Sequence, residues 1–320
     1  MSPRIALTLG DPRGIGPEIA AKAMRALPAG TDVILVGPAA MLDLVPGGAH
    51  AEAGDAPAGY VRRLQAETPG GAVTYPLLRC DAEVAGLLVR AQVEHAVRLA
   101  QAGTVDAIVT GPAEKLALRR AGVEHPGHTE WLAALTGAPA VAMMLTDERL
   151  RVVLATTHVP LRRVPDLLTR ETVERVGRLT IDALCRWWGI PAPRLALCAV
   201  NPHAGEGGLF GREDDAVLAP AAAVLGAAGP LPADTVFVRA LRGEFDAVLA
   251  PYHDVGMTAI KVAAFGRGVN VTLGLPIVRT SPDHGTAFDI AGQGRADEGS
   301  LLAAIALAGK LGTRVRASAP

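Results

Sequence analysis

Short apolar runs alternate along the chain with longer segments in which apolar residues recur at helical spacing. Several of the short runs are apolar at every position, which is typical of parallel strands covered on both faces. Strands are expected at residues 4–9, 33–36, 107–110, 140–145, 151–156, 195–200, 247–250 and 269–273.

The longer segments predict amphipathic helices. Between residues 171 and 188, Val173, Val176 and Leu184 belong to an apolar stripe, and the charged residues lie elsewhere. Strands that alternate with helices in this way indicate an α/β fold with a mostly parallel sheet. Helices are expected at residues 17–27, 84–102, 130–135, 171–188, 213–225 and 300–311.

Two segments lack periodicity. Residues 47–59, rich in Gly, Ala and Pro, predict a mobile loop, and residues 313–320 predict a frayed tail. A length of 320 residues fits two domains or one large one. No clear linker divides the chain, so a second domain is expected as an excursion from the first.

Composition narrows the class of protein. Half of the residues are hydrophobic but only 3% are aromatic, a mixture that suits helices and buried parallel strands better than a β-sandwich. The formal net charge of −1 gives no electrostatic reason to expect nucleic acid or an anionic membrane as a partner.

The sequence also bears on the compartment. The cysteines are few and scattered, so buried or idle thiols are expected and no disulfide framework. The N-terminus lacks the apolar region and cleavage site of a signal peptide, and no apolar run reaches the ~20 residues of a transmembrane helix. A cytoplasmic protein is therefore expected.

Three histidines stand at equivalent places. His158, His203 and His253 each follow the end of an apolar strand, and ligands of open α/β sheets bind outside those ends. A single histidine in such a place is more often a capped or solvated loop residue. Three repeats of the placement favour an open, catalytic type of site for zinc or a similar divalent ion.

Neighbouring polar residues extend this hypothesis. Asp254 and Asp234 either orient a ligand histidine or act as ordinary helix and turn caps, with Asp234 expected at the start of a strand. The remaining candidates, His50 in the loop, His95 in a helix and His125 before a proline, are expected to be structural or exposed.

Glycines and basic residues suggest anion binding. The turn GDPRGIGPE joins the first strand to the first helix, but it is not the GxGxxG of a dinucleotide site and can be a tight turn only. Lys261, Arg267, Asn270 and Arg279 can cradle phosphate or carboxylate, or be solvated surface charges. His128 and Thr129 lie at the start of a predicted helix. There they either bind an anion or only cap the helix.

At this point the sequence resembles a known family, the 4-hydroxythreonine-4-phosphate dehydrogenases, often called the PdxA family. The resemblance covers essentially the whole chain. It is carried, in order, by GDPRGIGPE, VTGPAEK, GHTE, ATTH, NPHAGEGG, GPLPADT, YHDVG, GVNVTLGLP, RTSPDHGTA and DIAGQGRAD.

The resemblance implies an isocitrate- and isopropylmalate-dehydrogenase-like fold, with two α/β domains around a central cleft. The domains would be residues 1–125 with 280–320, and residues 126–279, the second holding the metal site and the dimer interface. It also implies a homodimer whose active site is shared across the interface, with His158 and His203 from one chain and His253 from its partner. The metal would be zinc, magnesium or cobalt.

Further residues follow from the same resemblance. A small phosphorylated substrate would be bound by His128, Thr129, Lys261, Asn270 and Arg279. NAD or NADP would be held by a loop like the adenosine-binding loop of isocitrate dehydrogenases, through His284, Gly285, Thr286, Ala287, Asp289 and Asp297. Lys261, Asp234 or Asp254 would act in catalysis, one of them as the proton acceptor.

The implied reaction is NAD(P)-linked oxidation, with decarboxylation, of 4-phosphohydroxy-L-threonine in pyridoxal phosphate biosynthesis. Arg13, Ala113, Glu114 and residues 209–211 depart from the usual family pattern. These departures keep open 4-phospho-D-threonate, 4-phospho-D-erythronate or a carboxylated aromatic cis-dihydrodiol as substrate. An acyl-phosphate transferase without redox chemistry is the alternative from another class, and it would need no site of three histidines.

Overall fold

The computed structural model describes residues 2–28, 30–42, 45, 49–52, 61–68, 71–78, 80–264 and 266–317. The chain forms two compact units, Met1–Ala138 with Leu275–Pro320, and Pro139–Gly274. The sequence-based division, at residues 125/126 and 279/280, differs because it assigns residues 126–138 and 275–279 to the second domain. None of the described helices is both long enough and apolar enough to span a membrane.

The first unit is built on a parallel sheet with strand order β13-β6-β1-β2-β3. A separate antiparallel hairpin pairs β4 with β5. The strands are β1 (Arg4–Thr8), β2 (Asp32–Gly37), β3 (Ala49–Glu52), β4 (Val61–Thr68), β5 (Gly71–Leu78), β6 (Ala107–Thr110) and β13 (Val278–Pro282).

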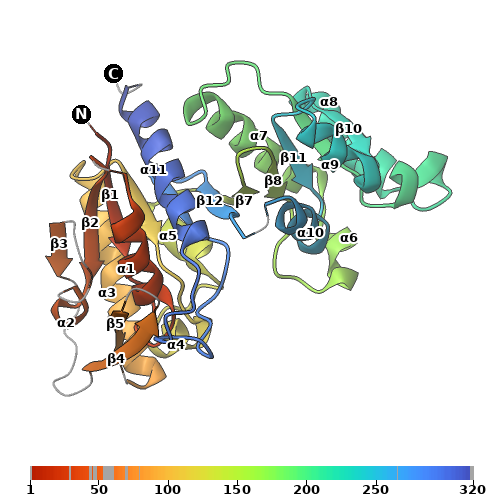
Figure 1. Ribbon diagram of the computed structural model, residues 1–320. Coiled ribbons are helices and arrows are strands. Elements are labelled where there is room, and N and C mark those ends of the chain that lie inside the picture. Colours follow the sequence, from red (N-terminus) through yellow and green to blue (C-terminus); the bar gives the residue numbers. More distant parts are fainter. Residues whose placement is uncertain are drawn as a thin grey trace. The chain divides into compact units, whose positions relative to one another are not determined.

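Helices cover both faces of this sheet (Figure 1). Helices α1 and α11 contact each other on one face, and α3 packs with α4 and α5 on the other. Asp81 is the N-cap of α3, and its carboxylate accepts a hydrogen bond from the Val84 N–H at 2.9 Å. The helices are α1 (Gly16–Ala26), α2 (Ala39–Leu42), α3 (Ala82–Gln101), α4 (Lys115–Arg120), α5 (His128–Thr136) and α11 (Gly299–Ala317).

The second unit has the strand order β10-β9-β11-β8-β7-β12. Its strands are parallel up to β8, whereas β7 runs antiparallel to both β8 and β12. The strands are β7 (Ala142–Thr146), β8 (Arg151–Leu154), β9 (Leu195–Cys198), β10 (Ala228–Leu231), β11 (Ala247–Ala250) and β12 (Val269–Leu273).

One face of this second sheet packs against α9 and α10, in a core that includes Val152, Val248 and Ile260. Helix α7 packs on the sheet too and contacts α8. The helical segments are η1 (Leu161–Arg163), α6 (Val164–Leu167), α7 (Arg170–Arg186), η2 (Pro202–Gly208), η3 (Asp214–Leu218), α8 (Ala219–Leu225), α9 (Ala233–Leu241) and α10 (His253–Ala264).

Some expectations need correction. Asp234 is not at a strand start, because it lies in the first turn of α9. Helix α11 continues to Ala317, so the expected frayed tail is helical up to that residue, and residues 318–320 lie outside the described part. Within the loop expected at 47–59, residues 49–52 form β3, and residues 47–48 and 53–59 lie outside the described residues.

Candidate functional site

The carboxyl ends of β8 and β11 lie side by side in the second unit. The Ala155 N–H donates to Ala250 O at 2.9 Å, and the buried Thr156 hydroxyl donates to Pro251 O at 2.8 Å. These two bonds fasten the segments that leave the strands. The residues that follow are therefore presented from a fixed platform.

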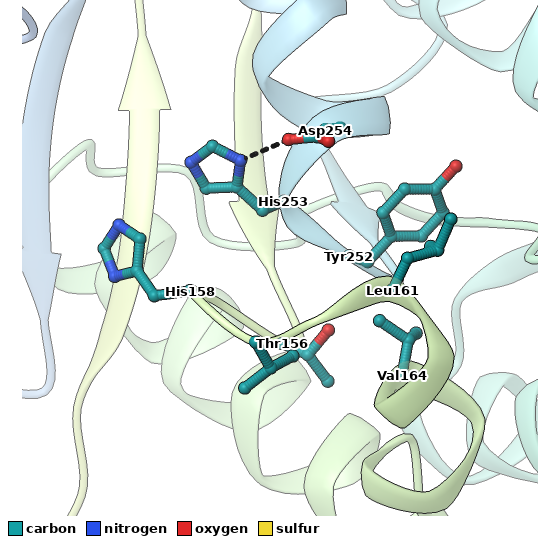
Figure 2. Close-up of a pocket in the computed structure, with 8 residues that line it drawn as sticks. Thr156, His158, Leu161, Val164, Tyr252, His253 and Asp254 are labelled. Atoms are coloured by element: carbon teal, nitrogen blue, oxygen red, sulfur yellow. Dashed lines mark hydrogen bonds and ion pairs between the residues drawn. The ribbon is translucent and has the colours of Figure 1, made fainter.

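Two of the expected metal ligands meet on that platform. His158 follows β8 with a φ of 42°, and His253 is the first residue of α10. Their ring centroids are 5.4 Å apart and the rings are tilted by 43°. Figure 2 shows both rings at a pocket that is also lined by Thr156, Tyr252, Leu161 and Val164.

The geometry of this pair fits a shared divalent ion. Two imidazoles on one tetrahedral metal have centroids about 5 Å apart, because each metal–nitrogen bond is about 2.0 Å long. The Nδ1 of His253 lies 2.7 Å from Asp254 Oδ1, which leaves Nε2 as the ligand nitrogen and the carboxylate as its orienting partner. The left-handed backbone of His158 is of the kind that gathers at functional sites.

His203 lies in a different place. It belongs to η2, where six successive residues from His203 to Gly208 have positive φ, and its ring packs 6.2 Å from that of Phe210. In the part of the chain that is described, no group of three or more His, Cys, Asp or Glu side chains forms a metal cluster. The structure thus pairs His158 with His253 of the same chain, whereas the sequence assignment took His253 from the partner.

Two acidic residues that sequence reasoning missed hold the His203 segment. The fully buried Asp214 accepts the N–H groups of Val200 and Asn201 at 2.9 and 3.1 Å. Glu213 accepts the Asn201 side-chain amide at 2.8 Å. In the sequence, only the acidic start of the helix predicted at 213–225 points to these residues. It does not reveal that Asp214 is buried.

The three candidate catalytic residues are all exposed. Asp254 adjoins the histidine pair, and Lys261 lies two turns further along α10. Asp234 stands in the first turn of α9, where a negative charge also stabilises the helix N-terminus. Arg267, from the expected basic cluster, is exposed as well.

A second candidate site lies in the first unit, around Arg279 of β13. Arg279 is only 3% exposed, and its guanidinium donates from Nε and Nη2 to the Thr110 hydroxyl at 3.1 and 2.6 Å. Burial lowers the pKa of Arg279 to about 10, so the buried cation persists at neutral pH. A buried positive charge favours an anionic ligand.

His128 adds a neutral donor to this positive region. Burial, with the nearby charges of Arg279 and Lys115, lowers the pKa of His128 to about 3. Its Nε2 is enclosed and has no hydrogen-bond partner among the described residues. Thr129 beside it is buried. Such groups fit a phosphate or carboxylate, which would supply the acceptor that Nε2 lacks.

Asn270, expected to bind substrate, lies on β12 of the second unit. Its Oδ1 is enclosed and has no hydrogen-bond partner in the described part of the chain. An enclosed amide oxygen without a donor costs free energy, so it fits a site that a ligand completes.

The expected nucleotide-binding residues form a loop between β13 and α11. His284 Nε2 is enclosed and unpartnered among the residues described, and Ala287 has a φ of 41°. The ring of Phe288 and the carboxylate of Asp289 are exposed. Asp297 instead accepts the Gly299 N–H at 2.7 Å, which caps α11.

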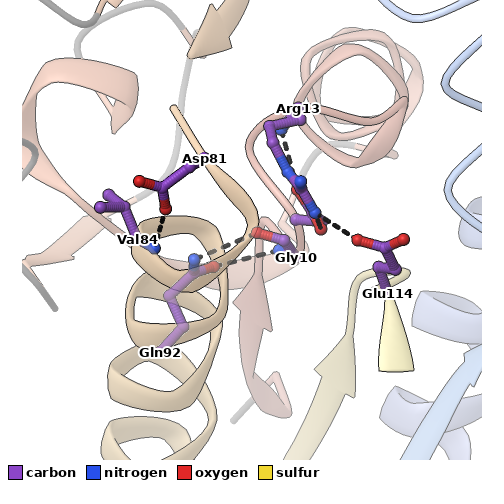
Figure 3. A network of polar contacts seen from close by, with 7 residues as sticks. Gly10, Arg13, Asp81, Val84, Gln92 and Glu114 are labelled. Carbon is purple, nitrogen blue, oxygen red and sulfur yellow. Dashed lines mark hydrogen bonds and ion pairs between the residues drawn. The ribbon is translucent and has the colours of Figure 1, made fainter. Parts of the chain in front are cut away.

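A polar network closes the glycine-rich turn between β1 and α1 (Figure 3). Arg13 forms ion pairs with Asp11 and Glu114 at 2.8 and 2.7 Å, and the hydrogen bond to Asp11 is the largest cause of its raised pKa. Gln92 of α3 bonds both the N–H and the C=O of Gly10. The charge of Arg13 is thus compensated within the chain by two carboxylates.

Comparisons with known proteins find relatives over nearly the whole chain. The family model described as pyridoxal phosphate biosynthetic protein PdxA matches residues 65–308. A 4-hydroxythreonine-4-phosphate dehydrogenase of Methylorubrum populi is 49% identical over 97% of this chain and 95% of the relative. A provisionally named D-threonate 4-phosphate dehydrogenase of Bradyrhizobium diazoefficiens is 44% identical over 99% of both chains.

Solved structures give the same result. A crystal structure of 4-hydroxythreonine-4-phosphate dehydrogenase from Klebsiella pneumoniae matches with a TM-score of 0.82 at 40% identity, over 98% of each chain. A β-decarboxylating dehydrogenase from Thermococcus kodakarensis matches with a TM-score of 0.50 at 17% identity, over 98% of this chain and 86% of that one. The second likeness concerns the fold alone, and it agrees with the expected isocitrate-dehydrogenase-like class.

Proposed function

Because the chain belongs to the family of the pyridoxal phosphate biosynthetic protein PdxA, we propose that it is a metal-dependent, NAD(P)-linked dehydrogenase of a phosphorylated hydroxy acid. The proposed substrate is 4-phosphohydroxy-L-threonine, and the oxidation is followed by decarboxylation. The observation that carries the proposal is the imidazole pair of His158 and His253 at the ends of β8 and β11.

We propose that these two histidines hold a divalent ion, zinc, magnesium or cobalt, and that His203 completes the site. When bound, such an ion acts as a Lewis acid that lowers the pKa of a substrate hydroxyl. The Asp254 carboxylate keeps the His253 ring in one orientation. His203 stands apart from the pair within one chain, so the proposed third ligand is the partner subunit's His203.

Substrate binding is assigned to the buried and basic residues. Arg279, His128 and Thr129 offer donors to an anionic group, and Lys261 and Asn270 are the proposed contacts from the second unit. Held in this way, the hydroxyl is oriented for loss of its proton to Lys261, Asp254 or Asp234. When bound, NAD(P)⁺ would accept a hydride from the carbon that bears this hydroxyl, and the resulting β-keto acid would lose CO2.

A homodimer is part of the proposal. Most of the large exposed apolar side chains in the described part of the chain lie in the second unit, among them Leu161, Leu209, Phe210 and Val262. Leu209 is 73% exposed and Val262 74% exposed. We assign these side chains to an interface with a second copy of the chain. The proposed compartment is the cytoplasm, consistent with the free thiols.

A second substrate is favoured by one specific observation. The relative from Bradyrhizobium diazoefficiens carries a name that refers to D-threonate 4-phosphate, and it matches almost the full length of both chains. 4-Phospho-D-threonate is therefore the alternative substrate. Both candidates carry a phosphate, so the anion-binding role of Arg279 is common to the two.

A substrate comparison tests the proposal. Reduction of NAD⁺ and of NADP⁺ is followed with 4-phosphohydroxy-L-threonine, 4-phospho-D-threonate, 4-phospho-D-erythronate and a carboxylated aromatic cis-dihydrodiol. The highest kcat/KM is expected with 4-phosphohydroxy-L-threonine, and a decisive preference for the dihydrodiol would contradict a phosphorylated substrate. Acyl-phosphate transfer without nucleotide reduction would place the protein in another enzyme class.

A further inference from the structure

A buried ion pair ties helix α1 to the loop between β13 and α11. Glu18 is 1% exposed, and its carboxylate accepts the N–H groups of Ala296 at 2.8 Å and Gly294 at 3.3 Å. Lys22, one helical turn further on, lies 3.1 Å from that carboxylate and donates to the C=O groups of the same two residues. Glu18 and Lys22 of α1 thus bind the N–H and C=O groups of both Gly294 and Ala296.

The helix start contacts the same loop at a second place. The Ile15 N–H donates to Thr286 O at 2.9 Å, and a Cβ on Gly14 would come within 2.7 Å of that oxygen, so only glycine permits this approach. The Arg13 guanidinium lies 5.1 Å from the centroid of the Phe288 ring. The first part of the loop is therefore held at Thr286 and Phe288, and the last part at Gly294 and Ala296.

These contacts leave the intervening residues free to face a ligand. The backbone on each side of Arg295 is bound to α1 while the Arg295 side chain is exposed, and Asp289 is exposed between the two sets of contacts. A loop that is bound at its ends before the ligand arrives loses less conformational entropy on binding.

We propose that Glu18 and Lys22 are positioning residues that hold this loop in the conformation that binds NAD(P). They act on the loop backbone and touch no reacting atom. The inference rests on the proposed function, because the loop is taken as the nucleotide site. It predicts that the pair determines nucleotide affinity and has little influence on the affinity for the phosphorylated substrate or the metal.

The test is NADH binding by titration calorimetry, together with KM values for NAD(P)⁺ and for the phosphorylated substrate. In Glu18→Gln, one of the two N–H groups faces an amide donor instead of an oxygen, and the NADH Kd is expected to rise about tenfold. The double variant Glu18→Gln/Lys22→Met leaves no buried unpaired charge, so it is expected to fold and to show the same loss. Lys22→Arg keeps the cation and is expected to retain most of the affinity.

Asp246→Asn is the matched control. Asp246 also accepts a backbone N–H and an arginine, both from Arg194, but it lies in the second unit. Its variant is expected to lower thermal stability and to leave the NADH Kd unchanged. Asp289→Ala serves as the positive control, because it alters the proposed nucleotide contact itself.

The outcomes separate the two hypotheses. A wild-type protein that binds NADH and a folded double variant with the same Kd would overturn the positioning role alone. A wild-type protein that binds no nicotinamide nucleotide would overturn the proposed function as well. Should the variants not fold, hydrogen exchange on the wild-type protein decides: the Ala296 amide is expected to be protected without nucleotide, and rapid exchange would refute the proposal.

Discussion

His128 shows how one partly buried residue links stability to pH. Its pKa falls from 6.5 to about 3, mainly because burial disfavours the charged ring and secondarily because Arg279 and Lys115 repel it. In the unfolded chain the ring takes up a proton below about pH 6.5, whereas the folded protein does not. Its contribution to stability is therefore complete above that pH and declines as the pH falls from 6.5 towards 3.

The variant His128→Gln should remove this dependence, since an amide has no proton to gain. Between pH 7 and pH 5 the wild type is expected to lose up to about 2 kcal/mol more unfolding free energy than the variant. Urea denaturation of both proteins at the two pH values measures the difference. Parallel losses in the two proteins would mean that the ring titrates normally in the folded state.

At the scale of the element, the segment η2 depends on the buried carboxylate of Asp214, with Glu213 as a second contact. Asp214 binds two successive backbone N–H groups where β9 leads into the segment that carries His203. The run of positive φ values from His203 onwards includes Ala204 and Glu206, which are not glycines. Such a backbone costs free energy and persists only when the surrounding contacts determine it.

Asp214→Asn should therefore weaken metal binding without removing a ligand. The amide can accept only one of the two N–H groups well, so His203 is held less rigidly, and the metal affinity is expected to fall about tenfold or more. Competition with a chelator measures this affinity, and the exposed neighbour gives a matched control in Asp215→Asn. Equal affinities in the two folded variants would show that the carboxylate does not serve the site.

The sequence predicted elements best where periodicity was long or burial complete. The strand expected at 247–250 is β11 to the residue, and the helix expected at 17–27 differs from α1 by one position at each end. β13 was missed because its Arg, Thr and Ser look solvated, although Arg279 and Thr280 are buried. Asp234 was misplaced because Gly and Pro in β10 hid the edge strand and the start of α9.

The sequence predicted a site made of histidines, but it did not predict which histidines lie side by side. The placement of each histidine after an apolar strand can be seen in the sequence. Which of them meet depends on the strand order β9-β11-β8, in which strands far apart along the chain are neighbours. No local pattern encodes that order, so the sequence could not show that His158 stands beside His253.

At the scale of the whole molecule, the proposed metal site requires two copies of the chain. His158 and His253 of one chain are together, and the proposed third ligand is the partner subunit's His203. Each dimer would then contain two sites, and each site would draw on both chains. A C2 dimer places the two sites equivalently, so exchange of subunits between inactive variants can reconstitute one of them.

The measurement that tests this most directly is the rate of NAD(P)H formation from the phosphorylated substrate after two inactive variants are mixed. His158→Ala and His203→Ala are mixed under conditions of proven subunit exchange. In a mixed dimer one site receives both substitutions and the other receives neither. Half of the dimers are mixed, each with one working site of two, so recovery should approach about a quarter of the wild-type rate.

The mixture of His158→Ala with His253→Ala is the control, and it should stay inactive because both residues come from the same chain. Bound metal, measured in the same samples, should follow the activity. Recovery is expected in the first mixture alone. Recovery in the second mixture and none in the first would contradict the same-chain pair, and wild-type activity in any of the single variants would contradict the metal site itself.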